Sequence, residues 1–273
     1  MSSYTVSDTK KITTKRIAEM KRTGEKIAML TAYDYTMASL LDEAGVEMIL
    51  VGDSASNVMQ GNLTTVPITL DEMIVYGKTV AKAAKRAMVL IDMPFGTYQG
   101  DPYEAQRNAI RIMQETGADG VKMEGGAEIR DAIELILRAG IPVCGHLGLT
   151  PQSVYKFGSY ALRASGDAEA KKLKEDALLL QELGCFILVT EKIPAALARE
   201  VTAMLDIPTI GIGAGSGTDG QVLVLQDMLG LNRGFKPKFL RLYDHLGDQI
   251  IDSVGNYIND VKNGEFPNEQ EQY

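Results

Sequence analysis

Five apolar segments of this 273-residue chain end in, or are followed by, polar side chains that can take part in chemistry. They are Asp53 with Ser54, Asp92, Lys122 with Glu124, His146, and Glu191. In a parallel α/β sheet or barrel all strands end at the same edge, so we expect these side chains to converge there. Carboxylates, an ammonium and an imidazole around one cleft can bind a cation, hold an anionic substrate and transfer protons. The pattern predicts an enzyme active site.

Three of the carboxylates, those of Asp53, Asp92 and Glu124, predict a divalent metal site. Carboxylates that are brought together raise one another's pKa unless a cation lies between them. Oxygen ligands suit Mg²⁺ or Mn²⁺, and the lack of cysteine or several histidine ligands argues against zinc. The alternative for a single acid is structural, since Asp53 precedes Ser54 and could cap a helix.

Lys122 lies two residues before Glu124, so both side chains point to the same face of a strand. The ammonium could neutralise a substrate carboxylate, or the amine could form a Schiff base as in a metal-independent aldolase. A third possibility is a buried ion pair with Glu124 or Asp92. The neighbouring acids favour the first, electrostatic role.

His146 and Glu191 are the candidates for proton transfer. His146 is one of two histidines and stands at a strand end beside small residues, which favours a role in the site over simple packing. Glu191 is not needed for the metal, and we therefore predict that it is the general base. The alternative is that Glu191 complements the dipole of the helix that follows it.

Strands and helices alternate along the chain and would position these groups. We predict strands at 27–31, 47–52, 87–92, 119–123, 141–145, 185–190, 208–213 and 221–225. We predict helices near 35–44, 70–84, 103–116, 128–139, 168–183 and 194–204. This alternation favours an α/β fold, a single closed (βα)8 TIM-type barrel, over an open doubly wound sheet. A leading helix (12–24) and a C-terminal helical extension (239–262) flank the barrel, and we expect one domain over 1–273 with flexible ends at 1–11 and 264–273.

A glycine-rich segment, 210–220, contains Gly215-x-Gly217-x-x-Gly220, which is the spacing of a dinucleotide-binding fingerprint. The match is weak, because it falls late in the chain and precedes strand-like residues instead of a long helix. Close approach of the backbone to a ligand, or tight turns, explains the glycines better.

Composition limits the partners and the compartment. A net charge of −8 argues against nucleic acid and acidic membranes as partners. The two cysteines, Cys144 and Cys185, lie in apolar segments and are expected to be small buried hydrophobes. The first residues lack the apolar region of a signal peptide, and no run of about 18 apolar residues could span a bilayer, so we expect a cytoplasmic protein.

Seven segments carry a family resemblance: MLTAYDYTMASLLDEAGV (29–46), ILVGDSASNVMQG (49–61), TTVPITLDEM (64–73), IDMPFGTY (91–98), GVKMEGG (120–126), GHLGLTPQ (145–152) and IGIGAGSGTDGQVLVLQDMLG (210–230). Together they closely resemble the ketopantoate hydroxymethyltransferase (3-methyl-2-oxobutanoate hydroxymethyltransferase) family. The resemblance implies a (βα)8 barrel similar to the phosphoenolpyruvate mutase and isocitrate lyase group. It also implies transfer of a hydroxymethyl group from 5,10-methylenetetrahydrofolate to 3-methyl-2-oxobutanoate, giving 2-dehydropantoate in pantothenate (coenzyme A) biosynthesis.

The resemblance also assigns roles to individual residues. Asp53 and Asp92 would be ligands of one Mg²⁺ per subunit, and Glu124 would complete the metal environment. The residues implied to bind substrate are Asp53, Ser54, Asp92, Lys122 and His146. Glu191 would remove the C3 proton, and the Mg²⁺-stabilised enolate would attack the one-carbon unit of the folate. A homo-oligomer, a decamer of two rings of five, is implied as well.

Two other functions fit the same residues. One is a lyase that makes or breaks carbon–carbon bonds of another 2-oxo acid through a similar enolate, without folate. The other is a barrel that binds a ligand or serves as a scaffold without chemistry, although the complete set of polar strand ends argues against it.

Overall fold

The computed structural model describes residues 10–234 and 236–273. The chain divides into two compact units, Met1–Leu223 and Val224–Tyr273, which are described separately here. One domain over 1–273 therefore stays a prediction. The same holds for flexible ends at 1–11 and 264–273, since residues 1–9 lie outside the described part of the chain.

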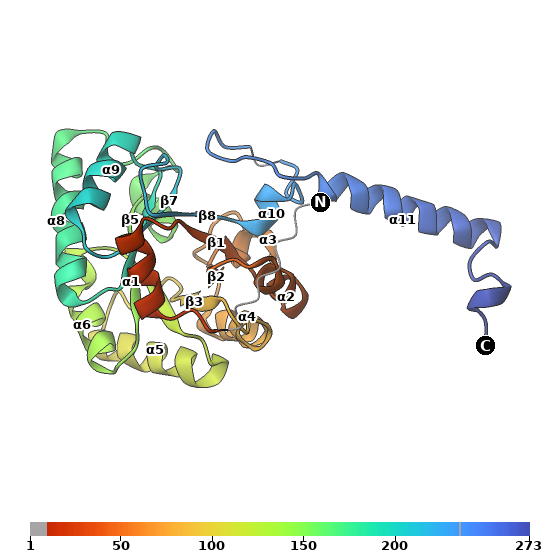
Figure 1. Cartoon of the computed structure of the whole chain (residues 1–273), viewed down its shortest axis with the longest axis horizontal. Helices are drawn as coiled ribbons and strands as arrows, with labels where there is room; N and C mark the ends of the chain where they lie inside the picture. The colour runs from red at the N-terminus through yellow and green to blue at the C-terminus, as the bar shows by residue number, and fades with distance from the viewer. Residues whose placement is uncertain (1–9, 235) are drawn as a thin grey trace. The chain divides into compact units, whose positions relative to one another are not determined.

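A closed barrel of eight parallel strands forms the first unit, with the strands paired in the order of the sequence (Figure 1). The strands are β1 (Ile27–Thr31), β2 (Met48–Val51), β3 (Met88–Asp92), β4 (Gly120–Glu124), β5 (Val143–Gly148), β6 (Ile187–Glu191), β7 (Thr209–Ile212) and β8 (Gly220–Leu223). All eight predicted strands are present, with shifted ends. The pairing of β8 with β1 closes the barrel and excludes the open sheet, which periodicity alone could not do.

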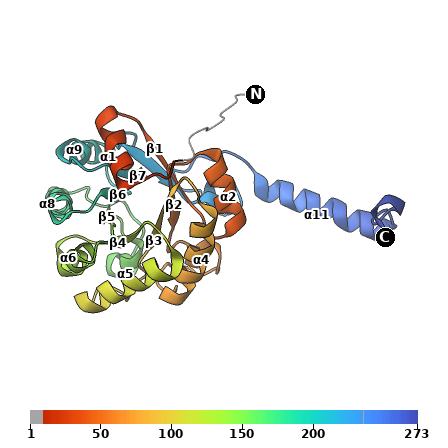
Figure 2. The same ribbon diagram turned by 60° about the horizontal axis from the view of Figure 1, so that its bottom comes forward.

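Helices surround the strands of the first unit (Figure 2). They are α1 (Thr14–Thr23), α2 (Tyr35–Ala44), α4 (Leu70–Ala83), α5 (Pro102–Thr116), α6 (Arg130–Arg138), α8 (Asp167–Leu183) and α9 (Ala195–Met204), each close to a predicted helix. Sequence periodicity did not predict the short elements between them: α3 (Ala55–Val58), α7 (Val154–Phe157) and the 3-10 turns η1 (Ala127–Ile129) and η2 (Pro151–Ser153).

Local sequence explains where the helices begin and end. Thr69 caps α4 by accepting a hydrogen bond from the Glu72 backbone, and the Glu72 carboxylate accepts one from the Thr69 N–H, which completes a capping box. Gly117 and Gly184 end α5 and α8 with φ values of 73° and 107°. Only glycine adopts this left-handed conformation without strain, so these two positions fix the helix ends.

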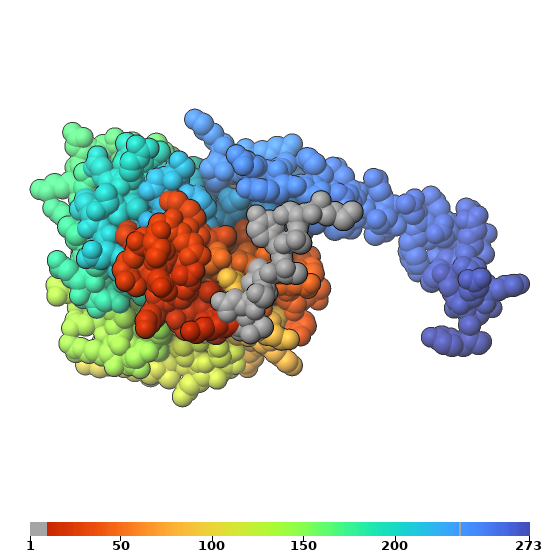
Figure 3. All heavy atoms as spheres, viewed as in Figure 1, coloured from red at the N-terminus to blue at the C-terminus, as the bar shows by residue number. Residues whose placement is uncertain are grey.

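Apolar side chains fill the interior of the barrel, and α1 covers one of its ends. Ile17 and Met20 of α1 pack in one buried cluster with Met48 and Met88, the first residues of β2 and β3, and Ile187, the first of β6. Figure 3 shows the α1 segment, in red, lying across the barrel on the side facing the viewer. The amino ends of the strands are therefore closed, and the carboxyl ends are the end where a site can open.

The second unit contains α10 (Leu225–Met228), α11 (Leu246–Asn263) and the 3-10 turn η3 (Glu269–Glu271). The predicted helical extension over 239–262 begins later than expected, at Leu246. Within this unit the amide of Asn232 donates to Asp227, and Arg233 forms an ion pair with Asp248 at 2.9 Å.

Candidate active site at the carboxyl ends of the strands

The polar side chains of the site lie on the same side of their strands as the apolar side chains that fill the barrel core. In β3, Met88 and Leu90 belong to the core cluster, and Asp92 is the next residue on the same side of the strand. In β5, His146 follows Cys144 in the same way. Alternation along the strands therefore turns the site residues into the barrel interior.

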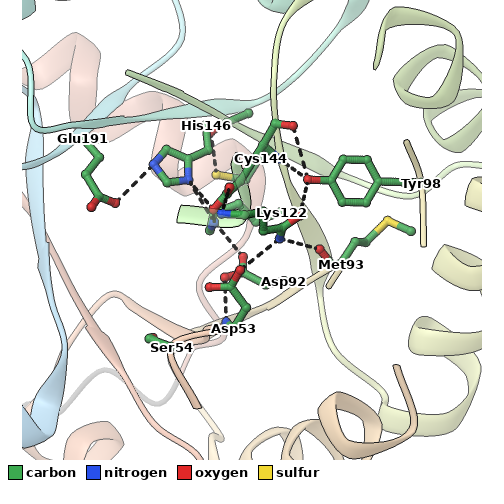
Figure 4. Close-up of polar contacts among 12 residues, drawn as sticks. Asp53, Ser54, Asp92, Met93, Tyr98, Lys122, Cys144, His146 and Glu191 are labelled. Carbon is green, nitrogen blue, oxygen red and sulfur yellow. Dashed lines mark hydrogen bonds and ion pairs between the residues drawn. The ribbon is translucent and has the colours of Figure 1, made fainter. Parts of the chain in front are cut away.

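Strand register brings these side chains into contact. Asp92 pairs with Lys122 between β3 and β4, and Glu124 pairs with His146 between β4 and β5. Nζ of Lys122 lies 2.8 Å from Oδ1 of Asp92, 3.2 Å from Nδ1 of His146 and 4.0 Å from Oε1 of Glu124. Figure 4 shows the Lys122 ammonium between the aspartate and the imidazole. The ion pair of Lys122 with Asp92 that the sequence offered as an alternative is present.

The imidazole of His146 lies between two glutamates. Nδ1 is 3.3 Å from Oε1 of Glu124, and Nε2 is 3.4 Å from Oε2 of Glu191. Burial and the charge of Lys122 lower the pKa of His146, but the two glutamates outweigh them and raise it to about 9. The raised pKa favours the imidazolium form of His146 near neutral pH.

Glu191 differs from the other charged groups in its exposure. Its side chain is 17% exposed, whereas Lys122, Glu124 and His146 are 4% exposed or less. A substrate that enters from the open end of the barrel can therefore approach the Glu191 carboxylate, while its partner His146 remains buried.

Asp53 and Ser54 lie in the turn between β2 and α3. The backbone N–H of Asp53 donates to Oδ2 of Asp92 at 3.0 Å, which joins this turn to β3. Ser54 is the residue before α3, and the Asp53 side chain bonds to Gln152 instead of capping that helix. Oγ of Ser54 lies 2.8 Å from the hydroxyl of Tyr33, so Ser54 is held at the edge of the cluster.

Burial and like charges set the protonation of the carboxylates. Burial, together with the charges of Glu124 and Asp92, raises the pKa of Asp53 well above its usual value. Burial also raises the pKa of Asp92, and this effect outweighs the ion pair with Lys122. For Glu124, burial is outweighed by His146 and Lys122, which lower its pKa. Among these three acids, Asp53 is therefore the one whose ionised form a further cation would stabilise most.

The residues present fit a divalent cation that is bound partly by substrate and water. Four carboxylates, those of Asp53, Asp92, Glu124 and Glu191, face two cationic groups, Lys122 and His146. With all four acids ionised, the negative charges would exceed the positive ones by two, which one divalent cation would offset. In residues 10–234 and 236–273, no group of three or more histidine, cysteine, aspartate or glutamate side chains has the arrangement of a metal site. Mg²⁺ commonly takes one or two carboxylates and completes its shell with substrate oxygens and water.

Three site residues were not identified from the sequence: Gln152, Tyr98 and Tyr33. The Gln152 amide donates to Asp53 at 3.0 Å, and the Tyr98 hydroxyl accepts from the backbone N–H of Glu124 at 3.0 Å. Tyr33 and Tyr98 lie in loops and Gln152 lies in the 3-10 turn η2, where no periodicity indicates the direction of a side chain. The signal available was their place in the segments TAYDYT, IDMPFGTY and GHLGLTPQ, which follow strands.

The glycines of the segment 210–220 allow close packing of the backbone. A Cβ atom on Gly215 would lie 2.5 Å from the Cβ of Ala195, and one on Gly217 would lie 3.0 Å from the Cβ of Arg199, both in α9. A Cβ on Gly220 would lie 2.3 Å from the carbonyl oxygen of Ile27. A four-residue strand follows instead of a long helix, so the loop lacks the architecture of a dinucleotide site.

Two predictions from composition can be compared with the structure. Cys144 and Cys185 are both buried and unpaired, as expected of small core residues. Across the described ranges of the chain, no helix combines the length and apolar character needed to cross a bilayer.

Known proteins that share one name align with all or nearly all of this chain. The 3-methyl-2-oxobutanoate hydroxymethyltransferase of Parabacteroides distasonis is 64% identical over 273 residues, which cover 100% of both chains. The protein of the same name from Flavobacterium johnsoniae is 60% identical over 266 residues, which cover 97% of this chain and 98% of that protein.

Solved structures share the fold at low sequence identity. A phosphonopyruvate hydrolase in complex with oxalate and Mg²⁺ superposes with a TM-score of 0.61 at 10% identity, covering 94% of this chain and 92% of that one. A phosphoenolpyruvate phosphomutase from Streptomyces platensis subsp. rosaceus gives a TM-score of 0.60 at 15% identity, covering 90% and 88%.

The family profile described as ketopantoate hydroxymethyltransferase matches residues 11–269, which include the barrel and every residue of the site described above. With relatives of that name at 60% identity or more over nearly the full length, the chain belongs to the ketopantoate hydroxymethyltransferase family.

Proposed function

We propose that this chain is a 3-methyl-2-oxobutanoate hydroxymethyltransferase of pantothenate biosynthesis. It would transfer a hydroxymethyl group from 5,10-methylenetetrahydrofolate to 3-methyl-2-oxobutanoate and release 2-dehydropantoate. Family membership and the full-length identity to proteins of that name support the overall reaction.

One observation supports the chemistry above all others: the part-exposed carboxylate of Glu191 lies beside a buried cationic pair. Nε2 of His146 is 3.4 Å from Oε2 of Glu191, and Nζ of Lys122 is 3.2 Å from Nδ1 of His146. In the proposed reaction Glu191 accepts the C3 proton of the oxo acid. Negative charge then develops on the keto oxygen, and cations fixed in a buried site stabilise such charge strongly.

The proposal includes one Mg²⁺ per subunit, held by Asp53 and Asp92 with Glu124 nearby. When bound, the cation supplies a Lewis acid that polarises the keto oxygen. Asp53 and Asp92 approach each other through the hydrogen bond between the Asp53 N–H and Oδ2 of Asp92. Lys122 and Ser54 would then orient the substrate carboxylate and keto group.

We also propose that the chain acts in the cytoplasm as a homo-oligomer, with a decamer expected from the family resemblance. Neither nucleic acid nor a membrane is a partner in this proposal, in keeping with the net charge of −8.

Proton NMR in D₂O tests the function in two stages. In the first, the enzyme, Mg²⁺ and 3-methyl-2-oxobutanoate are combined without folate, and loss of the C3 proton signal is followed. In the second, 5,10-methylenetetrahydrofolate is added, and formation of 2-dehydropantoate is measured. The proposal expects exchange in the first stage and product in the second.

Each stage excludes a different alternative. A lyase would exchange the C3 proton of other 2-oxo acids and cleave a carbon–carbon bond in them. It would form no 2-dehydropantoate when the folate is added. Absence of both exchange and product from folded protein with Mg²⁺ present would contradict the proposed function. Exchange without Mg²⁺ after treatment with a chelator would contradict the role of the cation alone.

A further inference from the structure

Gln152 makes hydrogen bonds with every polar atom of its side chain, although it plays no part in the chemistry proposed above. Its Nε2 donates to Oδ2 of Asp53 and to the carbonyl oxygen of Met93, both at 3.0 Å. Its Oε1 accepts from the hydroxyl of Tyr98 at 2.8 Å and from Nε2 of Gln99 at 3.0 Å. A primary amide has two N–H donors and two acceptor sites, so the capacity of this one is filled.

These partners allow only one orientation of the amide. If it turned over, its oxygen would face the Asp53 carboxylate and the Met93 carbonyl oxygen, and its NH₂ group would face the amide N–H of Gln99. Each of these three contacts would be repulsive. The side chain is 4% exposed, so water cannot replace the lost partners cheaply. The surrounding residues therefore direct the N–H groups of Gln152 at Asp53.

The backbone of Gln152 holds a second carboxylate. Its N–H donates to Oε2 of Glu124 at 3.0 Å, while Oε1 of the same carboxylate lies 3.3 Å from His146. One oxygen each of Glu124 and Asp53 is thus bound to Gln152. The other oxygen of Glu124 faces His146, and the second oxygen of Asp53 is the one left for a cation or a substrate.

Tyr98 links these two contacts. Its hydroxyl accepts from the backbone N–H of Glu124 at 3.0 Å and donates to Oε1 of Gln152 at 2.8 Å. Hydrogen bonds in such a buried chain strengthen one another, and residues that orient metal-binding carboxylates commonly tune metal affinity. We propose that Gln152 is a positioning residue, which fixes the Asp53 carboxylate in the orientation that binds the divalent cation. This inference rests on the cation of the proposed function.

Affinity for Mn²⁺ in the absence of oxo acid and folate tests the role directly. Binding is measured from the electron paramagnetic resonance signal of free Mn²⁺, with wild type and Gln152→Met, at a temperature well below both unfolding midpoints. Methionine has similar length and volume but cannot donate to Asp53. The expected result is a dissociation constant raised by about tenfold or more. An affinity within about twofold of wild type in folded Gln152→Met would overturn the inference, because loss of one metal-orienting bond should exceed that change.

Gln99→Leu is the matched control. Gln99 is exposed and bonds to the same amide oxygen, but it contacts neither carboxylate. Its loss is expected to change the dissociation constant by no more than about twofold. If Gln99→Leu weakened Mn²⁺ binding as much as Gln152→Met, the effect would belong to the whole loop, and the assignment to Gln152 would be wrong.

Tyr98→Phe decides the question if Gln152→Met does not fold. This variant keeps Gln152 but removes the donor that fixes its amide oxygen, and we expect Mn²⁺ affinity to fall by about threefold or more. Unchanged affinity in folded Tyr98→Phe would overturn the inference in that case. Failure of the wild type to bind Mn²⁺ would instead contradict the cation site within the proposed function, so the two failures are distinguishable.

Discussion

Nε2 of His146 lies 3.4 Å from Oε2 of Glu191, and this contact joins the part-exposed carboxylate to the buried charges below it. The two residues belong to the neighbouring strands β5 and β6. An imidazolium beside a carboxylate attracts it and favours one orientation of its oxygens. The relationship supports the proposed role of Glu191 as the proton acceptor.

Glu191→Gln should slow proton abstraction strongly while leaving the oxo acid bound. We expect deuterium exchange at C3 of 3-methyl-2-oxobutanoate to slow by about 10²–10⁴-fold, because the amide cannot accept the proton. Affinity for the oxo acid, measured by calorimetry, should change little. Glu200→Gln is the matched control, since Glu200 is exposed on α9 and pairs with Lys174. Exchange at the wild-type rate in Glu191→Gln would assign the base elsewhere.

The ionisation of His146 gives a prediction for pH. Its pKa in the folded protein is about 9, above the value of about 6.5 for an unperturbed histidine. Its contribution to the free energy of unfolding is therefore complete below about pH 6.5 and disappears as the pH rises through about 9. NMR titration of the imidazole in the metal-free protein should show the raised pKa. Glu191→Gln should lower it, since one of the charges that raise it is removed.

A midpoint near pH 6.5 or below for the His146 imidazole would contradict this account. It would mean that burial and Lys122 outweigh the two glutamates. His146 would then be neutral in the reaction and could not stabilise negative charge as a cation.

Lys122 should form no Schiff base with the oxo acid. Its ammonium lies 2.8 Å from Asp92, and three carboxylates raise its pKa, so the uncharged amine that attacks a carbonyl is rare. Borohydride reduction with 3-methyl-2-oxobutanoate present, followed by mass spectrometry, should leave the peptide that contains Lys122 unmodified. An adduct there that requires the oxo acid would favour covalent catalysis over the electrostatic role.

Gly148→Ala should disturb the backbone of Glu191. Gly148 has a φ of 97°, and a Cβ atom on it would lie 2.3 Å from the carbonyl oxygen of Glu191. We expect the free energy of unfolding to fall by about 3 kcal/mol or more, from left-handed strain together with the clash. Gly158→Ala is the matched control. Its φ is 71°, but nothing lies within 4 Å of the new Cβ, so about 1–2 kcal/mol of strain alone is expected.

Thermal or denaturant unfolding of both variants measures these losses, and C3 exchange at a temperature where both are folded measures the effect on the base. Exchange should be slowed in Gly148→Ala and unaffected in Gly158→Ala. Equal losses of stability in the two variants would show that the backbone of β6 yields to the added methyl group.

The sequence was sufficient to predict the strands and to place the candidate site at their carboxyl ends. Apolar segments such as Met88–Ile91 end in a charged residue, and parallel strands place their carboxyl ends together. Closure of the barrel was not predictable from periodicity, because it depends on the pairing of β8 with β1, which are far apart in the chain.

The partners of individual site residues were less predictable. Register decides that Asp92 faces Lys122 and that Glu124 faces His146, and register follows from the pairing of whole strands. Gln152 lies in the turn η2, where neither helical nor strand periodicity applies. Its role emerged only from its contacts in the folded chain.

The inward-facing row Met88, Leu90 and Asp92 has a consequence for how such an enzyme can evolve. Inserting or deleting one residue within β3 turns every later side chain of the strand to the opposite face. Such a change would expel the carboxylate from the site and an apolar side chain from the core at the same time. New reactions on this barrel are therefore expected to arise from substitutions at the strand ends and from changes in loop length, which leave the inward-facing rows of the strands intact.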